Sequence, residues 1–195
     1  MKPEQFHLGE VADVQLGITL RGTDASRHDP AGTHQLVRIG DVSDDGELRI
    51  SEPNLVRLDD PTANRSELRA GDVLLAARGT RMTAAVFDGS FPAVAGSQFC
   101  IIRPNVDRLL PAYLLWFLNL PSTQEKLIAR ARGSYVRSLP VGSLAELDVI
   151  IPSPAKQRSI AKLHELRLRE KQLMETLAAR RAVLIDRTLF QSLQS

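Results

Sequence analysis

The sequence contains one cysteine and no long hydrophobic run, and these two shortages exclude several classes of protein. Cys100 is the only cysteine among 195 residues, so neither an intramolecular disulfide nor a zinc site built from several cysteines can form. No window approaches the roughly 18 consecutive apolar residues of a transmembrane helix. The N-terminal residues also lack the apolar core of a signal peptide, so we expect a cytoplasmic protein that is neither secreted nor bound to a membrane.

The motifs of the common enzyme classes are also missing. The histidines, His7, His28, His34 and His164, are scattered and form no pair with the spacing of a zinc protease. The chain has no phosphate-binding loop, no glycine-rich dinucleotide fingerprint, no Gly-x-Ser-x-Gly motif and no methyltransferase signature. The sequence therefore argues against an enzyme, and we expect no directly bound metal or cofactor.

An acidic stretch leaves one catalytic alternative open. The aspartates that could feed the metal site of a small nuclease are Asp41, Asp44, Asp45, Asp59 and Asp60. Residues 41–52 also follow the spacing of a calcium loop, but a strand-like pattern precedes them and Pro53 follows at once. We favour a turn and a solvated acidic loop over a metal site. Magnesium-dependent cleavage of nucleic acid by the pure protein would reverse that preference.

Positive charge is concentrated in the last part of the chain. Residues 1–152 carry 16 Lys or Arg and 19 Asp or Glu, a net charge of −3, whereas residues 153–195 carry 9 and 4, a net charge of +5, which together give +2. So small a total excludes a histone-like polycation, and a nucleic acid would have to bind a local basic patch. Arg far outnumbers Lys, which suits phosphate and guanine recognition, although GC-rich codon usage would produce the same bias.

The first 152 residues have the composition and pattern of a strand-rich domain. Hydrophobic residues make up 43% of the chain and charged residues 25%, as in ordinary globular proteins. The pattern predicts a hairpin over 36–50 around the turn Asp44-Asp45-Gly46, and single strands at 55–58, 73–76, 84–87, 99–102 and 147–151. It also predicts a helix over 109–118, entered through Pro111, and a second helix that opens with a Ser122–Glu125 capping box. The predicted fold class is α+β, with a short helical subdomain.

One long helix is predicted for residues 153–195, because no Gly or Pro occurs from Ala155 to about Ser192. Steps of seven residues indicate a coiled-coil seam, which Glu170 and Arg180 interrupt. The helix would span on the order of 55 Å at 1.5 Å per residue, which is too long for a compact domain. We expect the seam to pack against another chain, with packing back onto its own domain as the alternative. The seam leucines are Leu166, Leu173, Leu177 and Leu184.

Two arginine-rich segments are candidates for a ligand-binding surface. Arg78-Gly79-Thr80-Arg81 follows a predicted strand, and residues 130–138 follow a predicted helix. In both segments glycine lets the backbone approach a ligand closely. Arginine, hydroxyl and small side chains are also the types that contact phosphates and base edges. Taken alone, the two segments favour solvated loops, with binding of DNA or RNA as the alternative.

The order of four motifs resembles the specificity subunit of type I restriction–modification systems. The matching segments are residues 8–19 (LGEVADVQLGIT), 37–42 (VRIGDV), 68–76 (LRAGDVLLA) and 147–154 (LDVIIPSP), the last running into the long helix. The resemblance covers essentially the whole chain, as a half-length form with one target-recognition domain and one conserved helix. Full-length subunits carry two such units, whose helices pack antiparallel as a spacer. The family often has Pro-x-x-Glu-Gln at the helix start, and Gln157 matches its glutamine.

The resemblance implies a subunit that does no chemistry itself. It would read a short sequence in double-stranded DNA and position a partner adenine methyltransferase that uses S-adenosylmethionine; a restriction nuclease–translocase subunit could join. One recognition domain per chain implies a homodimer through residues 155–192, and hence a bipartite palindromic target. Two alternatives stay open: an interaction or regulatory module of a defence system without DNA sequence preference, and the small metal-dependent nuclease.

The residues predicted to contact DNA come from the two arginine-rich segments, an early glycine-flanked loop and one possible adenine reader, Gln98. They are Arg21, Thr23, Arg78, Thr80, Arg81, Gln98, Arg132, Tyr135 and Arg137. The predicted dimer interface consists of the seam leucines of the long helix.

Overall fold

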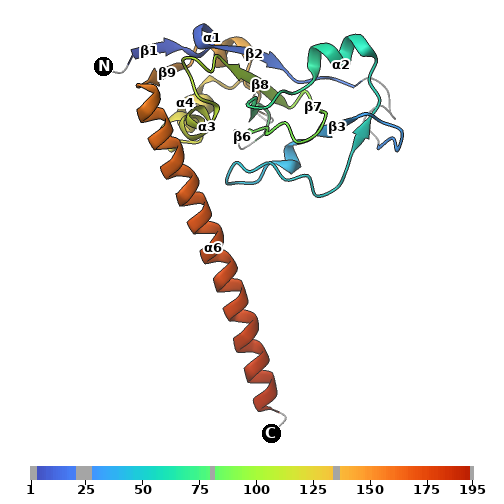
Figure 1. The fold of residues 1–195 in the computed structure, drawn as a ribbon, viewed down its shortest axis with the longest axis vertical. Helices are drawn as coiled ribbons and strands as arrows, with labels where there is room; N and C mark the ends of the chain where they lie inside the picture. The colour runs from blue at the N-terminus through green and yellow to red at the C-terminus, as the bar shows by residue number, and fades with distance from the viewer. Residues whose placement is uncertain (1–3, 21–27, 80–81, 134–136, 194–195) are drawn as a thin grey trace.

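Figure 1 shows a body of short strands and helices, from which one long helix extends away. The computed structural model describes residues 4–20, 28–79, 82–133 and 137–193. The helices are α1 (Leu8–Val11), α2 (Asp60–Ser66), α3 (Pro111–Leu118), α4 (Pro121–Arg130), α5 (Val141–Ala145) and α6 (Pro154–Ser192), with a 3-10 turn, η1, at Ile39–Asp41. The strands are β1 (Glu4–His7), β2 (Ala12–Leu16), β3 (His34–Val37), β4 (Leu55–Val56), β5 (Val73–Ala76), β6 (Ala84–Val86), β7 (Ala93–Ala95), β8 (Phe99–Pro104) and β9 (Asp148–Ile151). The α+β prediction is confirmed.

The described strands form one central sheet and two smaller ones. The central sheet has the order β2-β8-β5-β6, and its neighbouring strands are all antiparallel. A second sheet has the order β4-β3-β7, in which β3 and β7 run parallel. The pair β1 and β9 forms the third sheet. The central sheet therefore holds the body together, because segments from both halves of the body meet in it.

Both faces of the central sheet are buried. On β5, Val73 and Leu75 belong to one hydrophobic cluster, while Leu74 and Ala76 belong to another. The first cluster also takes side chains from α3, α4 and α5, and the second takes side chains from β3 and β7. Successive side chains of a strand point to opposite faces. The unbroken apolar run over 73–76 is therefore a strand that is covered on both sides, as such runs usually are.

A buried ion pair joins the two inner strands of this sheet. The carboxylate of Asp72 is only 1% exposed and accepts hydrogen bonds from Nε and a terminal nitrogen of Arg103, at 2.8 and 2.7 Å. It also accepts from the backbone nitrogen of Arg69, at 2.8 Å. The hydrogen bonds from Arg103 to Asp72 raise the pKa of that guanidinium. Arg103 is therefore a structural arginine, because its charge is used to keep a buried carboxylate satisfied.

The predicted hairpin over 36–50 is wrong, although its turn is present. β3 ends at Val37 and the 3-10 turn follows, so β3 pairs with β4 and β7 instead of with residues 48–50. What remains is a tight loop, closed by a bridge between Val42 and Leu48 and turned at Gly46, where φ is 78°. The other predicted strands are present as β4, β5, β6, β8 and β9, with small differences at their ends. Local alternation indicated a strand here, but it placed the start of the strand two residues late and could not identify its distant partners.

Proline sets the start of two helices. α3 begins at Pro111, as predicted, because the missing N–H of proline costs nothing in the first helical turn. The Ser122–Glu125 capping box is wrong, since α4 begins at Pro121, its N-cap is Leu120, and no side chain caps it. Proline again takes the first helical position, and this moves the helix start ahead of Ser122.

Three of the aspartates considered for a nuclease site, Asp41, Asp45 and Asp59, have structural roles. Asp59 caps α2, which the sequence analysis did not predict, by accepting a hydrogen bond from a backbone N–H of its first turn at 3.3 Å. Asp41 accepts from the backbone nitrogen of Arg38 at 2.7 Å, and Asp45 pairs with Lys171 of α6. Within the part of the chain that the structure describes, no three His, Cys, Asp or Glu side chains are grouped so as to hold a metal ion.

The long helix leaves the body where the two ends of the body meet. β1 pairs antiparallel with β9, and β9 leads through Pro152 and Ser153 directly into α6. α6 is a continuous helix of 39 residues, so the predicted long helix is confirmed. Among the described residues, no helix is both long and apolar enough to cross a membrane.

Candidate nucleic-acid interface

The two arginine-rich segments meet at one place on the body. Ser138 forms bridges with both Arg78 and Arg132, the latter through two backbone hydrogen bonds of 2.8 and 2.9 Å. The backbone nitrogen of Gly79 donates to the carbonyl oxygen of Arg137, at 3.1 Å. The loop that follows β5 and the loop that follows α4 are therefore tied together by backbone hydrogen bonds, although they are far apart in the sequence.

A third loop brings the predicted adenine reader to the same place. The backbone nitrogen of Ala77 donates to the carbonyl oxygen of Gln98 at 2.8 Å, just before β8 begins. The side chains at this place that were predicted to contact DNA are all exposed. We call this set the arginine edge, and it consists of Arg78, Gln98, Arg132 and Arg137. The predicted residues Arg21, Thr23, Thr80, Arg81 and Tyr135 lie outside the described residues.

Glycine allows the chain to turn directly after two of these arginines. Gly79 follows Arg78 with φ 107°, and Gly133 follows Arg132 with φ 105°. Other L residues rarely adopt such a backbone, because their Cβ atom would clash with the neighbouring peptide. At Gly79 an added Cβ would meet nothing within 4 Å. Glycine is therefore required there because of the backbone conformation, not because of a lack of space. The two glycines thus hold the arginines at turns on the surface.

The arginines of the edge carry charge that the rest of the described structure does not neutralise. Some other arginines of the body are paired, for example Arg57 with Asp29 at 3.3 Å and Arg49 with Glu47. Over residues 4–20, 28–79, 82–133 and 137–193, no ion pair involves an arginine of the edge. An unpaired exposed guanidinium is free to bind a phosphate or a base edge.

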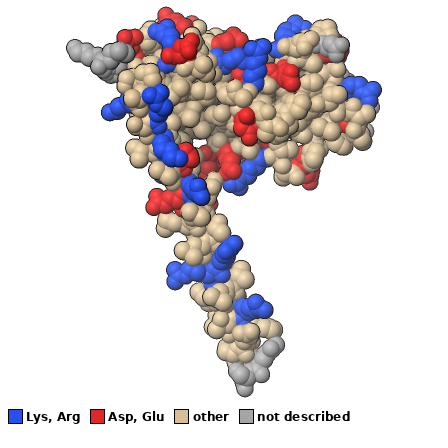
Figure 2. Space-filling view, in the orientation of Figure 1, with Lys and Arg blue, Asp and Glu red and all other residues tan. Residues whose placement is uncertain are grey.

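The remaining visible surface of the body is not uniformly basic. Figure 2 shows Lys and Arg side chains interspersed with Asp and Glu side chains over this face. That distribution agrees with the net charge of −3 over residues 1–152. A nucleic acid therefore cannot be attracted by the whole body, and the arginine edge is the candidate local patch.

The predicted dimer leucines of α6 point into solvent. Leu166, Leu173, Leu177 and Leu184 are 50%, 62%, 57% and 64% exposed. The alternative in which this stripe packs back onto its own body is therefore wrong. Such a row of exposed leucines is unusual on a soluble surface.

Gln157 anchors the start of α6, a role that sequence reasoning missed. Its side chain is 1% exposed. Its Oε1 accepts from the backbone nitrogen of Leu110 at 2.9 Å, and its Nε2 donates to the carbonyl oxygens of Arg108 and Pro152 at 2.8 and 3.0 Å. A single amide thus joins the first turn of α6 to the segment before α3 and to the end of β9. The glutamine matched to the family motif was the available signal, but its burial was not visible in the sequence.

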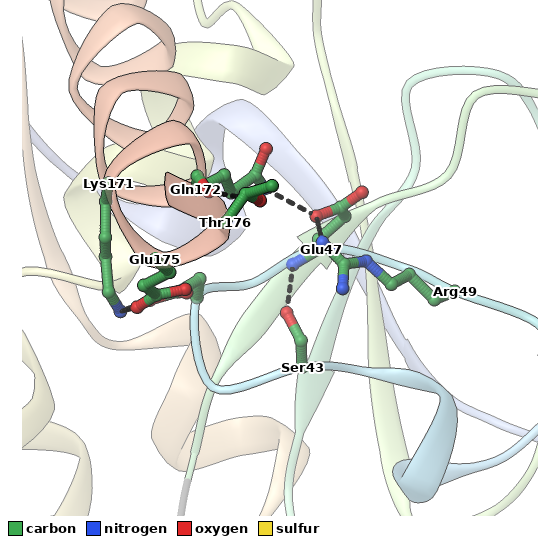
Figure 3. Close-up of polar contacts among 8 residues, drawn as sticks. Ser43, Glu47, Arg49, Lys171, Gln172, Glu175 and Thr176 are labelled. Atoms are coloured by element: carbon green, nitrogen blue, oxygen red, sulfur yellow. Dashed lines mark hydrogen bonds and ion pairs between the residues drawn. The ribbon is translucent and has the colours of Figure 1, made fainter. Parts of the chain in front are cut away.

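A second attachment holds the middle of α6. Figure 3 shows that Lys171, Gln172 and Glu175 of the helix lie beside the turn at residues 43–47. Lys171 pairs with Asp45, and Nε2 of Gln172 donates to the carboxylate of Glu47 at 2.7 Å. A hydrogen bond from Arg49 is the main cause that lowers the pKa of Glu47. We call residues 43–47 the acidic turn, and together with Gln157 it fixes the direction in which α6 leaves the body.

The fold and this interface define a class of protein. The chain combines a mixed α+β body, a loop edge that carries exposed arginines, and a long helix with an exposed apolar stripe. The family model for the type I restriction modification DNA specificity domain matches residues 2–175. The chain belongs to this family, so the predicted resemblance is confirmed. No curated protein matches the sequence significantly.

Solved structures with the same fold come from type I systems. One similar chain comes from a structure of the type I R-M system that addresses its complex assembly and conformational transition. Its TM-score is 0.69, and its identity is 17% over 91% of this chain. The HsdS subunit from Thermoanaerobacter tengcongensis has a TM-score of 0.61 and 18% identity over 86%. The S subunit from M. genitalium has a TM-score of 0.59 and 17% identity over 91%. This chain spans only 41%, 37% and 41% of those three chains.

Proposed function

We propose that this chain is a DNA sequence-specificity subunit of a type I-like restriction–modification system, and that each copy reads one half-site. The observation that carries the proposal is the arginine edge. Loops from three parts of the sequence are tied together so that unpaired arginines and one glutamine share a surface. Arginine paired with guanine is the commonest specific base contact, and glutamine can pair with adenine. Family membership supports DNA as the ligand.

In this proposal the chain supplies recognition and its partners supply the chemistry. An adenine methyltransferase subunit would bind beside it and use S-adenosylmethionine, while a restriction nuclease subunit could join the same complex. The chain itself would bind no cofactor and no metal ion. These roles rest on the family and on similarity to a chain from a type I R-M system. Because the DNA and these partners would be in the cytoplasm, the chain would act there.

The proposal includes a homodimer through α6. The exposed leucine stripe supports the dimer, because pairing would remove it from water. Two-fold symmetry would make the two half-sites inverted copies of one sequence.

The test is selection of DNA targets from a pool of random duplexes by the full-length chain, alone and with the methyltransferase subunit of the same system. We expect enrichment of a bipartite palindrome. A pool that binds without any enriched sequence, or that fails to bind even with the methyltransferase present, would contradict the proposal.

Substitution in the arginine edge gives the second step of that test. With the selected duplex, we expect Arg78→Ala and Arg137→Ala each to lower affinity by about 1–3 kcal/mol where the arginine reads a base, or mainly to flatten the salt dependence where it binds a phosphate. Arg57→Ala is the matched control, since it removes an exposed arginine that Asp29 already pairs. Equal affinities and salt slopes for all three variants would exclude the arginine edge as the interface.

One observation favours a second candidate. The exposed apolar stripe of α6 would equally suit an interaction module that binds the methyltransferase and regulates it without reading DNA. The same selection separates the two candidates, because such a module would capture the methyltransferase yet enrich no sequence.

A further inference from the structure

Between residues 166 and 184, the polar interruptions of the α6 seam follow the same symmetry as its leucines. Leu166 and Leu184 lie at equal distances on either side of Glu175, and so do Leu173 and Leu177. Glu170 and Arg180 lie at equal distances from it as well, and their charges are opposite. In heptad terms, each of these three pairs places one residue at an a position and the other at a d position, which are the positions that face each other in an antiparallel pair.

We propose that two copies of this chain pair their α6 helices antiparallel about Glu175, in a register that two reciprocal Glu170–Arg180 ion pairs select. This inference rests on the proposed homodimer and names its geometry. In this register the leucine layers are Leu166 against Leu184 of the partner subunit and Leu173 against Leu177 of the partner subunit, each formed twice. Each glutamate lies between two leucine layers and faces the arginine of the other copy.

The competing arrangements are worse for reasons of charge and packing. A parallel pair in register would place Glu170 against its own copy and Arg180 against its own copy, and like charges at seam positions repel. An antiparallel pair shifted by one heptad keeps only half of the leucine layers. Each shift also places a charged residue opposite a leucine at the centre of the seam, Glu170 in one shift and Arg180 in the other. The proposed register does so only at its outer ends, where Arg187 faces Leu163. A polar residue at a seam position commonly specifies register in this way.

The body leaves the seam accessible. The residues of α6 that are buried or partly buried against the body are Gln157, Ile160, Ala161, His164, Leu168 and Gln172, which share one face of the helix. Glu170 and Arg180 lie on the other side, and both are exposed. Neither has an ion pair in the described part of the chain, so both charges are available to a partner.

The register sets the distance between the two bodies. Each helix runs from Pro154 at its body to Glu175 at the centre of symmetry. At 1.5 Å per residue, the starts of the two helices would be about 60 Å apart, with a body at each end. Gln157 and the acidic turn hold each body to its own helix, so the helix pair would act as a ruler between the two arginine edges.

Cysteine cross-linking tests the register in the full chain. We expect a mixture of Leu166→Cys and Leu184→Cys proteins to form a disulfide-linked dimer, and neither protein alone to do so. In the proposed register, two copies of residue 166 are about 27 Å apart, far beyond the reach of a disulfide. The native Cys100 does not interfere, because it is buried and burial raises its pKa to about 11. Leu166→Cys mixed with Leu177→Cys is the control for a shift by one heptad.

The outcomes separate the register from the proposed function. Cross-linking of Leu166→Cys alone would indicate a parallel pair, and cross-linking of the control mixture would indicate a shifted one; either result overturns the register while the DNA selection still stands. A wild-type chain that stays monomeric with its target duplex, in sedimentation at micromolar concentration, overturns the dimer itself.

Charge reversal tests the ion pairs without touching the leucines. We expect Glu170→Arg and Arg180→Glu each to weaken dimerisation about tenfold or more, because both reciprocal pairs become repulsive. The double variant restores opposite charges and should return to within about threefold of wild type. Helix content measured by circular dichroism should stay unchanged in all three. Single variants that dimerise like wild type, or a double variant weaker than both, would refute the role of these residues.

Discussion

Replacing Gln157 with Ala should weaken the attachment of α6 to the body. The substitution removes three hydrogen bonds of 2.8 to 3.0 Å from a side chain that is 1% exposed. Each such bond contributes about 1 kcal/mol net, and alanine recovers a few tenths of a kcal/mol through its helix propensity. We therefore expect the free energy of unfolding to fall by about 2.5 kcal/mol, which corresponds to roughly 5–10 °C in Tm for a chain of this size.

Urea unfolding followed by tryptophan fluorescence measures this effect directly. Trp116 is the only tryptophan, and it lies beside Ile160 in the cleft at the base of α6, so its emission reports on that contact. Arg158→Ala is the matched control, one position along the helix and exposed. Gln157→Glu keeps an acceptor for the Leu110 N–H but cannot donate, so it should also destabilise. A Gln157→Ala protein as stable as the Arg158→Ala protein would refute the anchoring role.

Three further substitutions test the body and its packing against α6. Arg103→Ala should cost about 3 kcal/mol in urea unfolding because it leaves the buried Asp72 carboxylate unpaired; a loss below about 1 kcal/mol would show that the carboxylate is satisfied in another way. Gly46→Ala should cost about 2 kcal/mol, since φ is 78° there and the new Cβ would lie 2.5 Å from the carbonyl oxygen of Ala84; unchanged thermal stability would contradict this. Burial lowers the pKa of His164, whose ring nitrogens have no hydrogen-bond partner among the described residues. The folded protein therefore loses stability as pH falls below the ordinary pKa of 6.5, because only the unfolded chain gains that proton. His164→Leu should remove this loss of stability. The free energy of unfolding of His164→Leu minus that of wild type should therefore be larger at about pH 5.5 than at pH 7.5, and parallel pH profiles would exclude the explanation.

Local patterns in the sequence were sufficient where a structure depends on near neighbours. The run over 73–76 was recognised as a strand, and Pro111 correctly marked the start of α3. The long helix was predicted because helix formation follows from residues three or four apart and from the absence of Gly and Pro. Its seam was visible for the same reason, since heptad spacing is a property of one helix.

The same patterns failed where a distant segment competes. Residues 36–50 alternate like a hairpin, yet β3 pairs with β4 and β7, because strand pairing is decided by which segments the core brings together. Ser122 and Glu125 have the spacing of a capping box, but Pro121 occupies the first helical position. Both errors arose from a local signal that was real but that a neighbouring or distant residue overrode.

For this protein the sequence alone determined the fold class, the long helix and, through its order of motifs, the family. It also supplied the charges and leucines whose symmetry about Glu175 predicts a dimer register. Only the tertiary structure decided that two arginine-rich segments share one edge, since hydrogen bonds at Ser138 and Gly79 join parts of the chain that sequence spacing does not relate. It likewise decided that Gln157 is an anchor. The physical reason is that the burial of a side chain and its hydrogen-bond partners depend on how the whole molecule packs. Helix propensity and hydrophobic periodicity depend only on residues that are close in the sequence.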